Sequence, residues 1–245
     1  MDAYLFEGAP KPVQILPEAL GMGGSWEGNA GRPVPLAWES HLVKRVHDFL
    51  APLDRPVLVD VGANTGSYAL LPALLPSLRV AAFEPNPAAC RILRQMLTQN
   101  GIFRNRAWTY EVALWSEESF GSVGQLQIPS PHASGCATLG HPTRFHPVGH
   151  TEVPLATLDN LIIKLKPSQF STVDFLKIDT EGAEKFVLQG AKETIARYRP
   201  TMLIECVAMN TAAFDYAPDE TLALLEQYGY SYEWVSTEDV WTTPQ

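Results

Sequence analysis

The chain has 245 residues, of which 46% are hydrophobic and 18% charged, as expected of a folded globular protein. Its net charge of −9, without any run of four basic residues, argues against nucleic-acid and membrane-surface partners, because both surfaces are anionic. No apolar run is long enough to span a bilayer, no signal-peptide pattern is present, and three cysteines without CxxC spacing favour a reducing compartment, so we expect a cytoplasmic protein.

The N-terminal part reads as an arm followed by a helix. Residues 1–36 are rich in proline and glycine, and both an irregular arm or lid and a flexible tail are consistent with this composition. Apolar residues at helical spacing predict an amphipathic helix over residues 37–50, ending before Pro52. We take residues 37–245 as one domain. An insertion at residues 116–152, which holds four of the six histidines, is expected at the working edge of the sheet.

From residue 57 onward, short apolar runs alternate with helical patterns. Strands are expected at residues 57–61, 80–83, 108–114, 173–178, 202–205, 230–235 and 240–242, the last two as a hairpin, with a short strand-like piece at 125–128. Helices are expected up to about residue 75 with a kink at Pro72, and at 86–100, 155–165, 183–198 and 219–228. This alternation predicts an α/β fold: a single Rossmann-like domain with a mostly parallel seven-stranded sheet and helices on both faces.

A glycine-containing turn follows the first expected strand, where ligands of open parallel sheets bind. Residues 60–66 read Asp-Val-Gly-Ala-Asn-Thr-Gly. Two glycines allow a tight turn and a close approach of backbone to ligand, and the helix expected next would offer free N–H groups. The candidate binding residues of this turn are Asp60, Gly62, Asn64, Thr65 and Gly66.

The next two strand ends add further ligand-binding candidates. Glu84 ends the second expected strand, where a carboxylate can accept hydrogen bonds from two ribose hydroxyls. Ala113 and Leu114 end the third and suit the flank of an adenine ring. Together the three strand ends predict a nucleoside-containing ligand.

The turn departs from the patterns that bind phosphate. The middle glycine of G-x-G-x-x-G is absent, since the turn reads Gly62-x-x-x-Gly66, and the G-x-x-x-x-G-K-[ST] pattern is absent too. A turn opened by Asp60 suits an ammonium group better than a phosphate. S-adenosylmethionine, which has an adenosine and an ammonium but no phosphate, therefore fits better than a dinucleotide, and an NAD-dependent oxidoreductase is the competing hypothesis.

Three carboxylates follow the fourth and fifth expected strands. Asp179, Glu181 and Glu205 should project into the crevice where a methyl group would emerge. A carboxylate there can orient an acceptor and remove its proton, and Asp179 would also border the cofactor. We assign no metal, although Mg²⁺ held by Asp179 and Glu205 would match that ion's preference for oxygen ligands. For Glu184 we favour a simpler role, an acid in the first turn of a helix.

The insertion contains side chains that could carry chemistry. Its histidines lack the spacing of a metal site, so we interpret them as solvated loop residues: His132, His141, His146 and His150. His132 and His146 also stand as candidate general bases, because imidazole titrates near neutrality. Cys136 has no evident base beside it and is interpreted as an ordinary small side chain.

Five blocks, taken in order, resemble the signature blocks of the FkbM-type methyltransferases. They are DVGANTG at 60–66, FEPN at 83–86, VPLATLD at 153–159, FLKIDTEGAE at 175–184 and residues 200–205. The similarity, which spans roughly residues 58–205, implies a class I methyltransferase fold, S-adenosylmethionine as donor and Pro85 as a further cofactor-binding residue. Residues 1–36 and 131–150 match no block, and substrate choice is expected to lie there.

The resemblance also implies a reaction, commonly O-methylation of a natural product or sugar hydroxyl. We therefore expect a small-molecule acceptor. An N-methyltransferase acting on a small molecule or peptide is the alternative within the class, and a binding module that has lost catalysis is a third hypothesis. The acidic charge disfavours an RNA acceptor. The sequence leaves the oligomeric state open.

Overall fold

The computed structural model describes residues 3–4, 13–14, 40–129, 134–141, 146–164 and 170–245. Within the predicted arm it describes only two short antiparallel strands, β1 (Ala3–Tyr4) and β2 (Val13–Gln14). The rest of residues 1–36 lies outside the described residues, so the lid remains a prediction. The first helix described, α2 (Ser40–Leu50), confirms the predicted amphipathic helix and its end.

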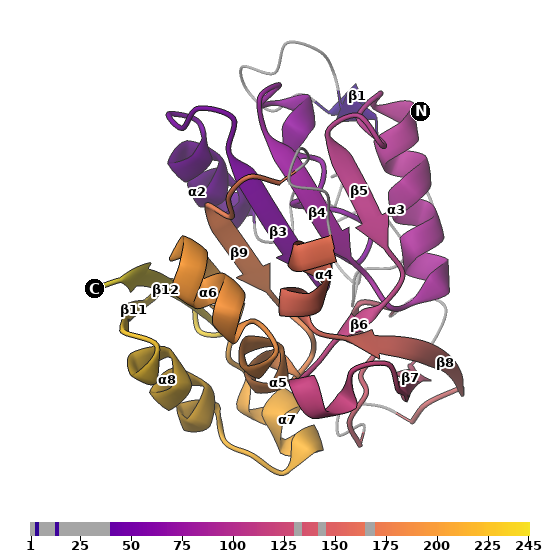
Figure 1. Ribbon diagram of the computed structural model, residues 1–245. Helices are drawn as coiled ribbons and strands as arrows, with labels where there is room; N and C mark the ends of the chain where they lie inside the picture. The colour runs from indigo at the N-terminus through magenta and orange to yellow at the C-terminus, as the bar shows by residue number, and fades with distance from the viewer. Residues whose placement is uncertain (1–2, 5–12, 15–39, 130–133, 142–145, 165–169) are drawn as a thin grey trace.

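A seven-stranded sheet forms the centre of the domain (Figure 1). Its strands are β3 (Val57–Val61), β4 (Arg79–Phe83), β5 (Ala107–Tyr110), β9 (Phe175–Ile178), β10 (Thr201–Glu205), β11 (Tyr230–Trp234) and β12 (Asp239–Pro244). Their order is β11-β12-β10-β9-β3-β4-β5, and β12 alone runs antiparallel to its neighbours. The mostly parallel sheet is therefore confirmed. Its topology switches between β3 and β9, which places a ligand crevice at their carboxyl ends.

Helices cover both faces of the sheet. The larger ones are α2, α3 (Pro87–Gln99), α4 (Leu158–Lys164), α5 (Glu184–Gln189), α6 (Lys192–Tyr198) and α8 (Pro218–Gln227). Side chains of α2 and α3 share one hydrophobic core with Leu58, whereas α4, α5, α6 and α8 share the opposite core with Val59. Neighbouring residues of β3 thus enter different cores, as the two-residue period of a strand requires. None of the helices described is long and apolar enough to cross a membrane.

The prediction of a helix directly after the glycine turn is wrong. In its place the chain makes turns and a short 3₁₀ helix, η1 (Leu71–Ala73). Pro72 lacks an N–H group and obstructs α-helical bonding, and the chain closes shorter bonds instead, from Leu71 N to Tyr68 O and from Ala73 N to Leu70 O. The turn therefore does not open onto an α-helix N-terminus, and the free helix N–H groups expected there for a ligand are absent from this described segment.

The third predicted strand is divided between two sheets. β5 ends in the main sheet at Tyr110, and the chain then forms β6 (Ala113–Leu114) in a three-stranded sheet with β7 (Val123–Ile128) and β8 (Gly149–Ala156). The strand-like piece in the insertion is confirmed and lengthened. β8 was missed, and α4 consequently begins at Leu158 rather than 155. This small sheet lies beyond the carboxyl ends of β3 and β9 (Figure 1).

The helix predicted over residues 183–198 is broken into α5 and α6. Gly190 is the C-cap of α5, and a Cβ atom there would lie 2.0 Å from the carbonyl oxygen of Trp115, so this position has no room for a side chain. Two short elements after β10 were not predicted, α7 (Ala208–Thr211) and η4 (Ala212–Phe214). The C-terminal hairpin of β11 and β12 is confirmed.

Candidate active site

A cavity of about 360 Å³ opens at the carboxyl ends of β3, β4 and β9. It is lined by eight of the residues that the sequence singles out: Gly62, Asn64, Glu84, Pro85, Ala113, Leu114, Asp179 and Glu181. The insertion supplies a facing wall with Leu126, Gly135, Cys136, Ala137 and Leu139. Asp60, Thr65, Gly66 and Glu205 do not line the cavity; the first three are buried and Glu205 is half-buried.

The glycine turn is attached to the neighbouring strands. The N–H groups of Gly62 and Ala63 both donate hydrogen bonds to the carbonyl oxygen of Phe83 at the end of β4, each at a distance of 3.0 Å. Gly62 has φ +76°, and a Cβ atom on it would lie 1.7 Å from the carbonyl oxygen of Asp179. The close approach that requires this glycine is therefore made by the chain itself, not by a ligand. Gly66 similarly makes room for the side chain of Leu93 on α3.

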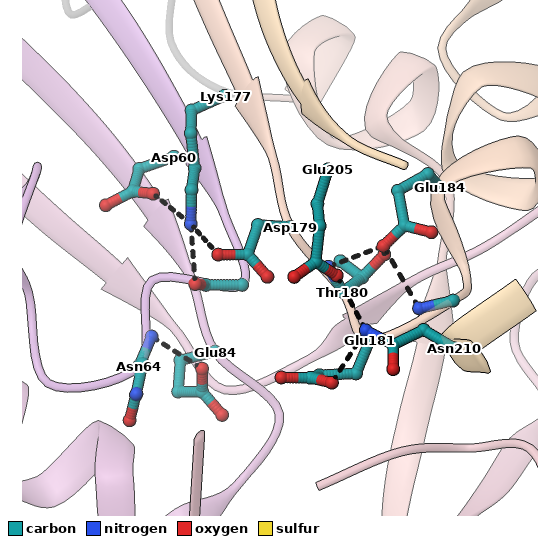
Figure 2. Close-up of polar contacts among 12 residues, drawn as sticks. Asp60, Asn64, Glu84, Lys177, Asp179, Thr180, Glu181, Glu184, Glu205 and Asn210 are labelled. Atoms are coloured by element: carbon teal, nitrogen blue, oxygen red, sulfur yellow. Dashed lines mark hydrogen bonds and ion pairs between the residues drawn. The ribbon is translucent and has the colours of Figure 1, made fainter. Parts of the chain in front are cut away.

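Glu84 is held rigidly at the end of β4. Its Oε2 accepts a hydrogen bond from the N–H of Asn64, and its Oε1 accepts one from the N–H of Asn86; each donor–acceptor distance is 2.7 Å (Figure 2). Burial raises the pKa of Glu84 to about 7, against the lowering effect of these two N–H donors. The remaining lone pairs of a carboxylate fixed in this way suit a pair of neighbouring hydroxyl groups on a ligand.

Asp60 lies beneath the turn rather than at the cavity surface. It is fully buried, and its Oδ1 is 4.0 Å from Nζ of Lys177. Burial raises the pKa of Asp60 to about 6, and the charge of Lys177 counteracts the rise. Asp60 is thus placed to face a lysine of the protein, whereas the sequence suggested that it faces the ammonium group of a ligand. Thr65 is also buried outside the cavity wall.

Lys177 is a site residue that the sequence reasoning missed. Its Nζ donates a hydrogen bond to Oδ2 of Asp179 at a distance of 2.9 Å and another to the carbonyl oxygen of Gly62 at 3.3 Å. Among the described residues that line the cavity, it is the only basic one. The available signal was a lysine inside an otherwise apolar strand, because a buried lysine requires charged or polar partners.

The three candidate catalytic carboxylates are brought together. One oxygen from each of Asp179, Glu181 and Glu205 lies within 4.8 Å of the others. Asn210 is another site residue that the sequence analysis missed. Its Nδ2 donates hydrogen bonds to both Glu181 and Glu205, each at 2.9 Å (Figure 2). Burial raises the pKa of Glu205 well above its ordinary value, and the neighbouring charges of Asp179 and Glu181 add to the rise. Asn210 thereby links Glu181, which lines the cavity, to Glu205, which does not.

Glu184 shapes the loop that carries these carboxylates. It lies in the first turn of α5, as predicted, but it is only 1% exposed. Its Oε1 accepts hydrogen bonds from the N–H of Thr180 at 2.8 Å and from Oγ1 of Thr180 at 2.9 Å. It also accepts one from the N–H of Gly182 at 3.1 Å. Glu181 between them has φ +55°, a conformation that costs free energy and is retained only where the surroundings enforce it. Glu184 therefore fixes the local backbone, beyond any interaction with the helix dipole.

The histidines and the cysteine of the insertion take different places. His141, His146 and His150 are exposed and absent from the cavity lining, which agrees with solvated side chains, although His150 belongs to β8. His132 lies outside the described residues. Cys136 lines the cavity as a free cysteine. In the part of the chain that the structure describes, Asp179, Glu181 and Glu205 form the only group of side chains arranged for a metal ion.

The residues present fit S-adenosylmethionine by their chemistry. Glu84 offers a fixed acceptor for ribose hydroxyls, and the buried side chains of Ala113 and Leu114 offer an apolar surface for adenine. Asn64 and Pro85 complete this side of the cavity, and the carboxylate of Asp179 stands at the other side. The same carboxylate group is of the kind that Mg²⁺ prefers, but nitrogen donors from Lys177 and Asn210 already contact it.

The sheet order with its single antiparallel strand, and a cavity at the carboxyl ends of the central strands, define a class I methyltransferase domain. The chain belongs to the FkbM methyltransferase family, whose profile, described as "Methyltransferase FkbM domain", matches residues 60–232. The family resemblance found in the sequence is therefore confirmed.

Two relatives show how far the similarity extends. Methyltransferase sdnD of Sordaria araneosa is 29% identical over 164 residues, which cover 56% of this chain and 61% of that protein. The crystal structure of methyltransferase FkbM from Methylobacillus flagellatus KT superposes with a TM-score of 0.50 at 17% identity, covering 78% of this chain and 44% of that one. The chain thus spans about three fifths of the length of the curated relative that it matches, and the structural likeness shows the fold.

Proposed function

We propose that this chain is an S-adenosylmethionine-dependent O-methyltransferase that acts on a hydroxyl group of a small molecule such as a natural product or a sugar. One observation carries the proposal: a single cavity is lined both by the carboxylate of Glu84, which two backbone N–H groups hold in place, and by the carboxylates of Asp179 and Glu181. Family membership supports methyl transfer, and a cavity of about 360 Å³ suits small-molecule ligands.

The proposed mechanism divides the work among residues of this chain. S-adenosylmethionine would supply an electrophilic methyl group. Glu84 would accept hydrogen bonds from its ribose hydroxyls, and Ala113 and Leu114 would form the apolar surface for its adenine. Asp179 orients the acceptor hydroxyl and accepts its proton, while the ammonium of Lys177 keeps that carboxylate in place. The residues of the insertion that line the cavity would limit the access of water to the reacting groups.

The carboxylates favour oxygen over nitrogen as the methylated atom. A hydroxyl must lose a proton when it is methylated, and a neighbouring carboxylate can accept it. An amine must instead be unprotonated to attack, and Asp179, Glu181 and Glu205 would stabilise its protonated, unreactive form. The negative surroundings also disfavour acceptors that carry phosphate near the reacting group.

The first test is binding. We expect calorimetric titration of the full chain to show binding of S-adenosylhomocysteine and none of NAD⁺. Binding of NAD⁺ without S-adenosylhomocysteine would replace the proposal with an oxidoreductase.

The second test is transfer. The chain is incubated with isotope-labelled S-adenosylmethionine and a panel of polyhydroxylated compounds and matched amines, and mass spectrometry follows the label. We expect labelled ethers. Label confined to amines would support N-methylation, and cofactor binding without transfer to any class would favour a binding module.

A further inference from the structure

We infer that Lys177 is a positioning residue that holds the Gly62 peptide and the Asp179 carboxylate in one geometry, and thereby links the donor side of the cavity to the acceptor side. The inference rests on the proposed function, because it assigns Lys177 to the same reaction. Its basis is the set of contacts around one buried ammonium group at the boundary between β3 and β9.

The contacts of Lys177 join two elements that are far apart in the chain. Its Nζ donates to Oδ2 of Asp179, two residues further along, and to the carbonyl oxygen of Gly62 in the glycine turn (Figure 2). The side chain is only 7% exposed, so water contributes little to holding the ammonium. Because both acceptors lie on the cavity wall, movement of the ammonium would disturb the two sides together.

Asp60 accounts for the presence of a charged group at this depth. Asp60 on β3 and Lys177 on β9 are direct partners in the parallel ladder, and both side chains are buried. An unpaired ammonium at this place would be costly, and Asp60 supplies a second negative charge 4.0 Å from Nζ. Asp60 therefore acts through Lys177, which explains why an acidic residue opens the turn without lining the cavity.

The backbone allows little slack between the same two elements. The Cα atom of Gly62 lies so close to the carbonyl oxygen of Asp179 that no Cβ atom fits between them. Packing thus fixes the separation of the turn and the strand end, and Lys177 fixes the orientation of the Gly62 carbonyl and the Asp179 carboxylate. Since its Nζ is engaged with these protein groups, Lys177 is assigned neither to binding a ligand anion nor to catalysis as a base.

The test measures the affinity of the full chain for S-adenosylhomocysteine by calorimetry, which needs no acceptor. The variants are Lys177→Met, Asp179→Asn and the double variant that combines them. The matched control is Lys44→Met, since Lys44 lies on the exposed side of α2. A further double variant, Lys177→Met with Asp60→Asn, removes the unpaired buried carboxylate and keeps the test valid if Lys177→Met alone fails to fold. Circular dichroism and thermal unfolding check the fold of each.

We expect Lys177→Met, alone or with Asp60→Asn, to weaken binding by about 10- to 100-fold, the scale of lost hydrogen bonds to charged groups. The Lys177→Met/Asp179→Asn variant should lose no more than the worse single variant, because both changes break one interaction. Folded Lys177 variants with wild-type affinity, or losses that multiply in the double variant, would overturn the inference, since a purely structural lysine gives one or the other. Failure of the wild-type chain to bind S-adenosylhomocysteine would instead reject the proposed function.

Discussion

The backbone N–H of Asn64 donates a hydrogen bond to Oε2 of Glu84 at a distance of 2.7 Å, so that one carboxylate joins the turn after β3 to the end of β4. The other oxygen of Glu84 accepts from Asn86, the capping residue of α3. The turn after β3, the end of β4 and the start of α3 are therefore all held by the side chain that we assign to the ribose. Changes at Glu84 should affect ligand affinity and local order together.

Replacing Glu84 tests the ribose assignment. In Glu84→Gln one oxygen becomes an amide nitrogen, which cannot accept a hydrogen bond, so the affinity for S-adenosylhomocysteine should fall by about 1.5–3 kcal/mol. Glu226→Gln makes the same change at an exposed position of α8 and should leave the affinity unchanged. Calorimetry that gives equal affinities for the two variants would remove Glu84 from the donor site.

The buried carboxyl groups should make stability depend on pH. Burial raises the pKa of Asp60 to about 6 and that of Glu84 to about 7, so the native state keeps protons that the unfolded chain has already lost. The free energy of unfolding should therefore be highest near pH 4 and fall as the pH rises to about 7, by up to about 1.4 kcal/mol per pH unit for each group. Glu184 and Glu205, whose pKa values are also raised, act in the same direction.

Urea denaturation across that pH range measures the slope. Asp60→Asn has no proton to lose at this position, so its free energy of unfolding should fall less steeply between about pH 4 and about pH 6 than that of the wild type. Equal slopes in the two proteins would show that Asp60 titrates normally in the native state.

Gly62 and Gly101 allow backbone strain to be separated from steric contact. Both have positive φ, but a Cβ atom on Gly62 would overlap the carbonyl oxygen of Asp179, whereas one on Gly101 has no atom within 4 Å. Gly101→Ala should cost about 1 kcal/mol of stability. Gly62→Ala should cost about 1–3 kcal/mol more and should weaken binding of S-adenosylhomocysteine, because the strand end must move. Equal losses in chemical denaturation would mean that the turn yields freely.

Asp179→Asn tests the chemistry with the acceptor found in the transfer assay. If Asp179 accepts the proton of the acceptor, turnover should fall by about 10²–10⁴-fold, whereas the affinity for S-adenosylhomocysteine should fall by no more than it does in Lys177→Met. A metal role makes a different prediction, namely that a chelator abolishes wild-type turnover and Mg²⁺ restores it. Turnover near the wild-type rate in the variant, together with resistance to chelator, would exclude both roles for Asp179.

The parts of the fold that were predictable are those encoded locally. β3 and β4 are continuous apolar runs because both faces of a central parallel strand are buried, and α3 carries its own start signal in Asn86 and Pro87. The grouping of Asp179 and Glu205 also followed from the sequence, because residues at the carboxyl ends of neighbouring parallel strands lie close together.

The features that were missed depend on contacts between distant segments. β8 contains Pro154 and several polar residues, and it becomes a strand through pairing with β6 and β7, which no local pattern specifies. Asn210 is an ordinary residue in sequence and becomes part of the site because α7 folds back onto Glu181. The glycine at position 190 similarly reflects the carbonyl of Trp115, seventy-five positions away by residue number, which leaves no room for a side chain.

The small sheet of β6, β7 and β8 has its own hydrophobic core, formed by Ala113, Leu126 and Val153. Ala137 and Leu139 of the cavity wall pack against this small core, whereas Leu114 of β6 and Ala156 of β8 belong to the core that α4, α5, α6 and α8 share. Substitutions at Ala137 and Leu139 should therefore disturb the main sheet less than substitutions at Leu114 or Ala156. If the proposed function holds, a search for variants that take new acceptors is thus best begun at Ala137 and Leu139, which belong neither to the main sheet nor to the residues assigned to the donor.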